Sequence, residues 1–247
     1  MYQALLAYSK ILEIRGDNLG ASTQLERAER LKKYFNSDWS VVEGSDMYAY
    51  AVDDKGVKHY EWVKIGSEIH GGESLKFIPL KCLTYPGKRN EKLLDYIFQK
   101  ELDKATREDN IESLTYLPDM FFKQGQAARA WLWMKHIISL KDLPHEHETQ
   151  GTNGDYPEIS FTFISQTVEG IMGISVNAAE GTISICPQLP EEIGDAKLLG
   201  LKFGEYSVDI SLDGNGISLK NNSPKPILWR CGENITVEPN SEKTMQK

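Results

Sequence analysis

Residues 156–193 read YPEISFTFISQTVEGIMGISVNAAEGTISICPQLPEEI, and the spacing of apolar residues changes within this stretch. Pro157 occupies a position that is favoured in the first turn of a helix. The residues that follow it are apolar nearly all round a helical wheel, which predicts a buried helix. After Gly173 the period changes from 3.6 to 2, and short runs such as TISICP and YSVDISL alternate with turn sequences such as DGNG. A helical part therefore ends near residue 174 and a small β part begins there.

Upstream of this stretch, apolar periodicity predicts further helices, some strongly amphipathic and others more uniformly apolar, as an outer and an inner helical layer would be. With the helix already described, the predicted helices are 2–15, 20–36, 74–83, 90–105, 113–122, 126–140 and 158–172. The segment MYAYAVDDKGVKHYEW predicts a β-hairpin inserted between helices near 47–62. The predicted organisation is a helical domain over 1–173 and an antiparallel β domain over 174–247.

Composition limits the possible classes of protein. The formal net charge of -8 argues against binding to a nucleic-acid backbone. No apolar run is long enough to predict a membrane span. The cysteines Cys82, Cys186 and Cys231 are far apart and form no CxxC pair, so they predict neither a disulfide framework nor a zinc cluster.

The stretch YPEISFTFISQTVEGIMGI, with GTISICPQLPEEI after it, resembles the end of a six-hairpin (α/α)6-barrel glycoside hydrolase, a superfamily that includes glucoamylases, trehalases and α-L-rhamnosidases. The segment LPDMFFKQGQAARAWLWMKHI, residues 117–137, is similar to the preceding outer helix of such enzymes. The resemblance implies a mainly α fold, a partial (α/α)6 toroid followed by a small antiparallel β domain. It also favours a periplasmic or extracellular protein.

The predicted helices are fewer than a complete barrel of this type contains, and the first helix begins at Met1 without a capping residue. We therefore expect the chain to be the C-terminal half of a longer enzyme that is inactive by itself. Its partner would be the missing N-terminal half or a second copy.

Glycoside hydrolysis normally uses two carboxyl groups on opposite sides of the scissile bond. The resemblance implies an inverting enzyme whose general base lies in the loop LPHEHETQGTNGDYPEISF, residues 143–161. Glu148 or Glu146 would be this base, with Glu148 preferred and Glu158 as a further candidate. The general acid would precede Met1.

Two other interpretations of this loop remain open. It can be a solvated connection without chemistry, or His145, His147 and the glutamates beside them can bind a metal ion. The metal is disfavoured because the two histidines lack the HExxH spacing and no third ligand is evident. We expect neither a metal nor a cofactor.

The remaining candidates are substrate-binding residues for an oligo- or polysaccharide. Trp62, Glu68, His70 and Glu73 lie beside the flexible Gly71-Gly72 pair, and His145 and His147 add polar groups. An indole can stack on a sugar ring while polar groups bind its hydroxyls. Alternatively, Trp62 packs the hairpin onto the helices and Glu73 caps a helix. The second class of function is a non-catalytic carbohydrate-binding or structural module.

Overall fold

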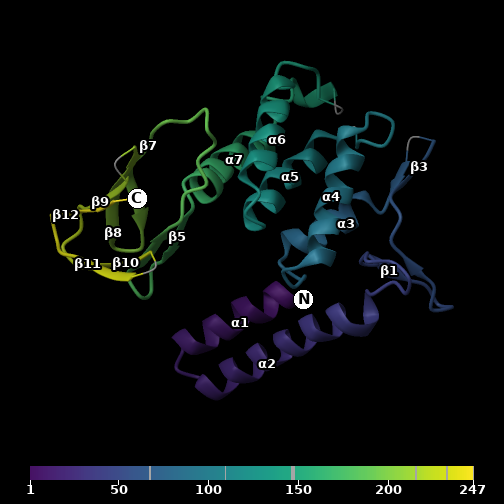
Figure 1. Cartoon of the computed structure of the whole chain (residues 1–247). Helices are drawn as coiled ribbons and strands as arrows, with labels where there is room; N and C mark the ends of the chain where they lie inside the picture. Colours follow the sequence, from purple (N-terminus) through teal and green to yellow (C-terminus); the bar gives the residue numbers. More distant parts are fainter. Residues whose placement is uncertain (67, 109, 146–147, 215, 232, 247) are drawn as a thin grey trace.

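The computed structural model describes residues 1–66, 68–108, 110–145, 148–214, 216–231 and 233–246; the side chains of Asp38, Glu148 and Glu233 also lie outside the description (Figure 1). The helices are α1 (Tyr2–Ile14), α2 (Asn18–Tyr34), α3 (Gly72–Leu80), α4 (Lys88–Leu102), α5 (Ile111–Lys123), α6 (Ala127–Ser139) and α7 (Pro157–Ser165). The π-helices η1 (Phe35–Trp39) and η3 (Gln166–Ile171) extend α2 and α7, and η2 (Glu148–Gln150) is a 3-10 turn. These bounds agree with the predicted helices to within a few residues.

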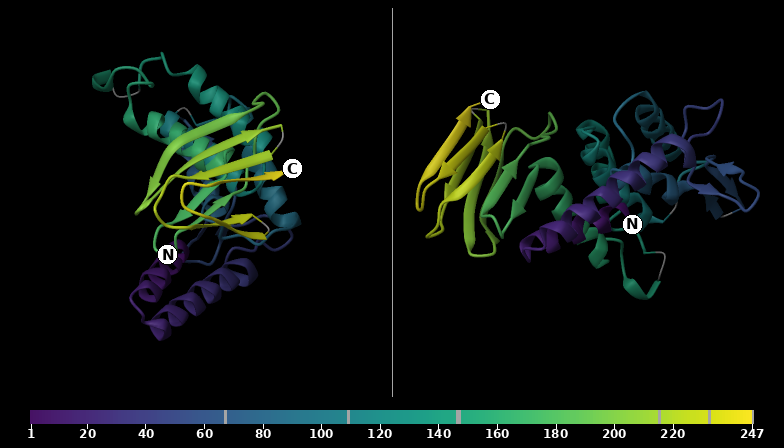
Figure 2. Two further views of the ribbon diagram at one scale, coloured as in Figure 1. Left: turned by 90° about the vertical axis from the view of Figure 1, so that its left-hand side faces the viewer. Right: turned by 90° about the horizontal axis from the view of Figure 1, so that it is seen from below.

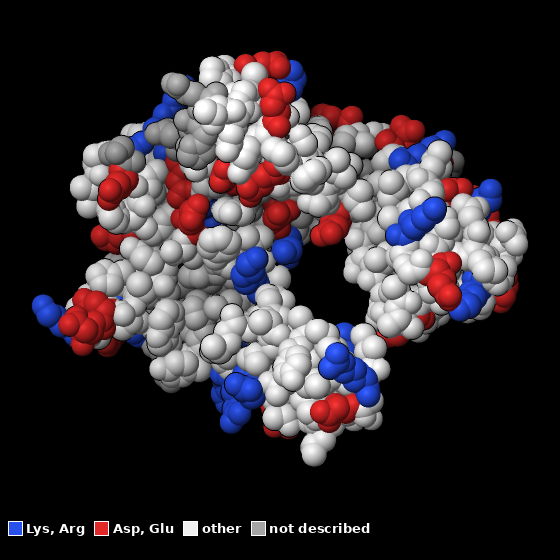
Figure 3. Space-filling model, turned by 180° about the vertical axis from the view of Figure 1, so that it is seen from behind, with Lys and Arg blue, Asp and Glu red and all other residues white. Residues whose placement is uncertain are grey.

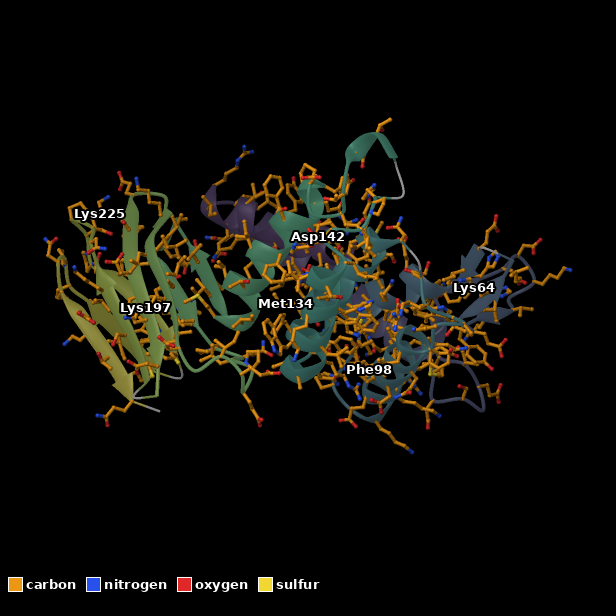
Figure 4. The ribbon with its side chains drawn as sticks, turned by 90° about the horizontal axis from the view of Figure 1, so that it is seen from above. Lys64, Phe98, Met134, Asp142, Lys197 and Lys225 are labelled. Carbon is orange, nitrogen blue, oxygen red and sulfur yellow. The ribbon has the colours of Figure 1, made fainter. Side chains whose placement is uncertain are left out.

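The strands form two small ribbons and two larger sheets. The ribbons pair β1 (Ala51–Val52) with β2 (Lys58–His59), and β3 (Val63–Ile65) with β4 (Glu68–His70). The larger sheets contain β5 (Ile174–Asn177), β6 (Thr182–Ile185), β7 (Ala196–Phe203), β8 (Tyr206–Asp213), β9 (Gly216–Asn221), β10 (Ile227–Cys231), β11 (Glu233–Val237) and β12 (Glu242–Gln246). Figure 4 labels Lys64 on the β3–β4 ribbon at one end of the molecule, and at the other end Lys197 on β7 and Lys225 in the turn between β9 and β10.

Helix α5 is the centre of the helical part. Asn110 caps it by accepting hydrogen bonds from the backbone N–H groups of Glu112 and Ser113, at 2.7 and 3.3 Å. Most of its side chains are buried, and it packs between α3, α6 and α7. Gln166 of η3 donates a 2.8 Å hydrogen bond to the carbonyl oxygen of Thr115. Helix α5 therefore fixes the positions of its neighbours, including α6, whose Met134 lies fully buried (Figure 4).

The predicted fold class is wrong. The described residues form seven α-helices together with twelve strands in four sheets, a mixed α and β structure, and their helices do not form a toroid. Helices α1 and α2 pack on each other as a hairpin beside the other helices (Figure 1). Apolar periodicity shows which face of a helix is buried, but it does not determine whether successive hairpins curve into a ring.

The prediction that the last helix is buried all round is also wrong. Only Ile159 of α7 is buried, whereas Phe161 and Ile164 are 69% and 61% exposed. The buried part of this segment is η3, in which Gln166, Gly170 and Ile171 pack against the interior. The change from α- to π-helical hydrogen bonding at Gln166 separates the exposed turns from the buried ones.

The two four-stranded sheets share one apolar core. Their strand orders are β11-β10-β6-β5 and β12-β9-β8-β7, and Figure 2 shows them as neighbouring layers. The core includes Ile183, Val208, Leu219 and Trp229, which are all fully buried. The strand pairings in these sheets are antiparallel except that β10 runs parallel to β6. The domain boundary near residue 174 stays a prediction.

A buried ion cluster joins the helices. The ammonium of Lys76 on α3 lies against both Glu101 of α4, at 3.1 Å, and Glu108 of the following loop. It also donates to the side-chain oxygen of Ser113 on α5 at 2.6 Å and to that residue's carbonyl oxygen at 3.1 Å. The ring of Trp62 lies 5.6 Å from the ammonium. Because removing these charges from water is costly, the cluster is stable only when all partners are in place.

Replacing Lys76 with methionine should lower the free energy of unfolding at neutral pH by about 3–5 kcal/mol, because it leaves two buried carboxylates without a cation. Burial raises the pKa of Glu101 in the folded protein. The contribution of this group is therefore complete below its unfolded pKa of about 4.3 and is lost as pH rises through the folded value. In Lys76→Met the free energy of unfolding should fall more steeply with rising pH than in the wild type.

Urea denaturation at several pH values measures both effects. The control is Lys10→Met, which removes an exposed cation that pairs with Glu13 and Glu180 and should change stability little. Equal stability of Lys76→Met and the wild type at neutral pH would contradict the role of the cluster.

Gly170→Ala should destabilise the protein by about 1–3 kcal/mol, because a Cβ at this position would collide with the buried ring of Phe122. Gly194 has open space around its Cα and serves as the matched control, since Gly194→Ala meets no neighbouring atom. Thermal unfolding of both variants measures the difference. Equal melting temperatures would show that the packing of η3 on α5 tolerates the extra carbon.

Candidate functional site

The loop between α6 and α7 is held in a defined shape. Pro144 and Thr152 form an isolated antiparallel bridge, and the backbone N–H of His145 donates to the carbonyl oxygen of Gly151 at 3.0 Å. Asn153 is buried, and its side chain donates to the carbonyl oxygen of Leu140 at 2.9 Å. These contacts bring the two ends of the loop together at the start of α7.

Four of the described α-helices carry a glutamate in their first turn. Three of these glutamates concern the site: Glu73 on α3, Glu112 on α5 and Glu158 on α7. A carboxylate is favourable at a helix N-terminus because it faces the unpaired N–H groups and the positive end of the helix dipole. This effect alone accounts for one glutamate at each helix, but it does not require the three side chains to lie near one another.

The phenol of Tyr116 lies within electrostatic range of all three carboxylates. Burial raises its pKa, and repulsion of its ionised form by nearby carboxylates raises the pKa further. The carboxylates that contribute are, in decreasing order, those of Glu158, Glu73, Glu112 and Glu108. We call these four side chains the acidic rim. Figure 3 shows acidic side chains gathered over the helical part of the face opposite to that of Figure 1.

Tyr156 connects two members of the acidic rim. Hydrogen bonding to Glu112 is the main cause that raises the pKa of the Tyr156 phenol to about 12. The same hydroxyl lies 3.5 Å from Oε2 of Glu158. The ring of buried His145 lies against that of Tyr156, with centroids 4.5 Å apart, and its Nε2 is 4.0 Å from Oε1 of Glu112. Two carboxylates, a phenol and an imidazole thus meet at the start of α7.

Glu108 connects the acidic rim to the buried ion cluster. One of its oxygens pairs with Lys76, and the other lies against the Cα of Gly72, where a Cβ would collide with it. The absence of a side chain at Gly72 therefore lets Glu108 approach the first turn of α3. Its side chain is only 9% exposed, compared with 28% for Glu112.

Sequence reasoning placed the general base in the loop before α7. Glu146 and His147 lie outside the described residues. Glu148 begins the η2 turn, and its side chain also lies outside the description. The assignment of Glu148 or Glu146 as the base stays a prediction, whereas Glu158, the further candidate, belongs to the acidic rim.

The predicted sugar-binding residues occupy different environments. Trp62 is fully buried, and its indole N–H donates to the carbonyl oxygen of Thr106 at 3.1 Å, which is the packing alternative. Glu68 and His70 are both exposed on β4, 3.7 Å apart. Glu73 lies in the acidic rim, and His145 lies beside it. As substrate-binding residues, these four and Trp62 stay predictions.

The sequence reasoning missed Glu108, Glu112, Tyr116 and Tyr156. The one signal available was that Glu112 follows a capping asparagine and Tyr156 precedes the proline that begins α7. In the described part of the chain, no group of three or more His, Cys, Asp or Glu side chains is placed to hold a metal ion. None of its helices is long and apolar enough to cross a membrane.

No protein-family model matches the sequence, and no curated protein matches it significantly. The arrangement of helices and sheets is nevertheless one that occurs among solved structures. One of these solved structures is a chain named as a kojibiose phosphorylase from the human microbiome, which matches with a TM-score of 0.52 and 14% sequence identity. The match covers 96% of this chain and 33% of that one, so the chain spans about a third of that protein's length. At this identity the likeness shows the fold alone.

Glu112→Gln should lower the pKa of the Tyr156 phenol from about 12 towards the ordinary value of about 10. The variant replaces the hydrogen bond from the phenol to a charged carboxylate with a weaker one to a neutral amide, and it also removes the charge that repels the phenolate. An alkaline titration followed by ultraviolet absorbance measures this change, and Tyr156→Phe identifies the signal. Glu26→Gln, on an exposed position of α2, is the control. An unchanged titration in Glu112→Gln would contradict the hydrogen bond.

Proposed function

We propose that this chain carries part of the active site of an enzyme that hydrolyses glycosidic bonds of an oligo- or polysaccharide. The observation that carries the proposal is the part of the acidic rim at the start of α7, where the Tyr156 hydroxyl lies 3.5 Å from Glu158 and Nε2 of His145 lies 4.0 Å from Glu112. The likeness of the fold to a chain named as a kojibiose phosphorylase supports a carbohydrate substrate. Because fold alone does not fix function, the proposal depends on the rim.

The chemistry of the rim suits this reaction. Glycosidic cleavage needs one carboxyl group that gives a proton to the leaving oxygen and a second that activates water or attacks the sugar. Glu112 and Glu158 share the Tyr156 hydroxyl, so both carboxylates are positioned by the same phenol. We propose that one of them binds and deprotonates the attacking water. Glu148, in the preceding loop, remains the alternative base.

The charge of the rim favours water over phosphate as the acceptor. The charges of Glu73, Glu112 and Glu158 all act on Tyr116, and the cation Lys76 is buried and already paired with Glu101 and Glu108. Like charges about 4 Å apart repel by about 1 kcal/mol in water and about 4 kcal/mol near a protein surface. A phosphate ion would therefore be disfavoured beside the rim, so we propose hydrolysis although the structural neighbour is named as a phosphorylase.

The test is an incubation of the purified chain, and of any longer form that supplies the rest of the active site, with kojibiose and a panel of other glucosides, with and without inorganic phosphate. Free glucose is the expected product, and its release should not depend on phosphate. Glu112→Gln and Glu158→Gln should each lower the rate by about 100-fold or more. Glu26→Gln on α2 should leave the rate unchanged.

Three results would contradict the proposal. Phosphate-dependent release of glucose 1-phosphate would replace hydrolysis with phosphorolysis. Full activity of the folded Glu112→Gln and Glu158→Gln variants would remove the rim from the mechanism, and Glu148→Gln then tests the loop. Binding of glucosides without turnover, also in the presence of any longer form of the protein, would favour a non-catalytic carbohydrate-binding module.

A further inference from the structure

A groove with six aromatic side chains in its lining lies beside α3, with a volume of about 520 Å3. It runs between the start of α1, the end of α2 with η1, and the stretch from Ser74 on α3 to Lys81 just after that helix. We call it the aromatic groove; its principal rings are those of Tyr2, Tyr34, Trp39, Tyr50 and Phe77. Its volume is in the range of binding sites for small molecules.

The rings are held in place by the fold. Phe35 is buried and packs against Trp39 on one side and Tyr48 on the other, with centroids 5.7 and 5.6 Å away. Tyr50 packs on Gly71, whose φ is 87° and where a Cβ would lie 2.6 Å from the tyrosine ring. A groove whose rings are fixed in advance loses little conformational entropy when a ligand binds.

The polar groups of the groove suit a neutral ligand rich in hydroxyls. No carboxylate lies among the described residues that line it, and its polar side chains are Gln3, Ser74 and Lys81. The Lys81 ammonium lies 5.7 Å from the Phe77 ring centre, and the Gln3 amide donates to the Lys81 carbonyl oxygen at 2.7 Å. The tyrosine hydroxyls and the Trp39 indole N–H add hydrogen-bonding groups to the apolar rings.

Helix α3 connects the groove to the acidic rim. Ser74, which lines the groove, follows Glu73 of the rim in the first turn of the helix. One turn further along, the ring of Phe77 lies in the groove and also packs against Tyr116, with centroids 5.1 Å apart. A molecule in the groove would therefore approach the carboxylates without leaving the surface of α3.

We propose that the aromatic groove binds sugar units of a neutral oligosaccharide while another part of the same molecule lies at the acidic rim. This inference rests on the proposed function only in placing the cleaved bond at the acidic rim. A sugar ring has apolar C–H faces that stack on aromatic rings and hydroxyls around its edge that need hydrogen-bonding partners. The combination of amphipathic rings and few charges matches this ligand better than an aliphatic helix face, which offers no hydroxyls.

The test measures binding by isothermal titration calorimetry, so it does not depend on turnover. The ligands are kojibiose and linear glucose hexasaccharides with different α- and β-linkages. At least one hexasaccharide should bind about tenfold more tightly than kojibiose. Tyr34→Ala and Trp39→Ala should each weaken hexasaccharide binding by about tenfold and leave kojibiose binding unchanged. Tyr34 is mostly exposed, so its variant should fold even if Trp39→Ala does not.

The matched control is Tyr8→Ala, which removes an exposed tyrosine of α1 that does not line the groove. Failure of every hexasaccharide to bind, or equal affinity of Tyr34→Ala and the wild type, would overturn the proposal. A change in sedimentation of Tyr34→Ala without any sugar binding would show instead that a second copy occupies the groove. The rim variants test catalysis and the groove variants test binding, so the two proposals can fail separately. If the rim variants lose turnover but still bind hexasaccharides, the groove binds sugar independently of the rim.

Discussion

The ammonium of Lys76, enclosed with two carboxylates and both oxygens of Ser113, sets the relative positions of α3, α4 and α5. A charge in the interior tolerates little displacement of its partners, because each lost contact exposes the full cost of desolvation. The cluster therefore determines how far α3 and α5 can slide along each other. Through Glu108 it also determines where the first turn of α3 meets the acidic rim.

The sequence predicted local structure well. The helices follow from apolar periodicity, and the start of α7 follows from its proline, whereas the cap that Asn110 provides for α5 was not predicted. The prediction failed where an outcome depends on contacts between distant segments. Whether the hairpins close into a ring, and whether Phe161 faces protein or solvent, is decided by the packing partner and not by the helix itself.

The candidate site shows the same limit. Glu158 was recognised because it lies beside a predicted helix start, and Glu73 because it lies beside two glycines. Their proximity to Glu112 requires three helices to begin at the same level, which a single sequence does not reveal. A signal for the buried cluster was present, since Lys76 is one of two lysines in the otherwise uncharged segment at 74–83, but its partners Glu101 and Glu108 lie far along the chain.

The parallel pairing of β6 with β10 has a consequence for how the chain folds. Between these strands the chain forms β7, β8 and β9, which pair locally as hairpins in the other sheet. The sheet that contains β5 and β6 can be completed only after this intervening segment has returned, and closing so long a loop carries an entropic cost. During synthesis the helical part would therefore emerge and begin to fold while β5 and β6, joined directly to it through η3, still wait for their neighbour.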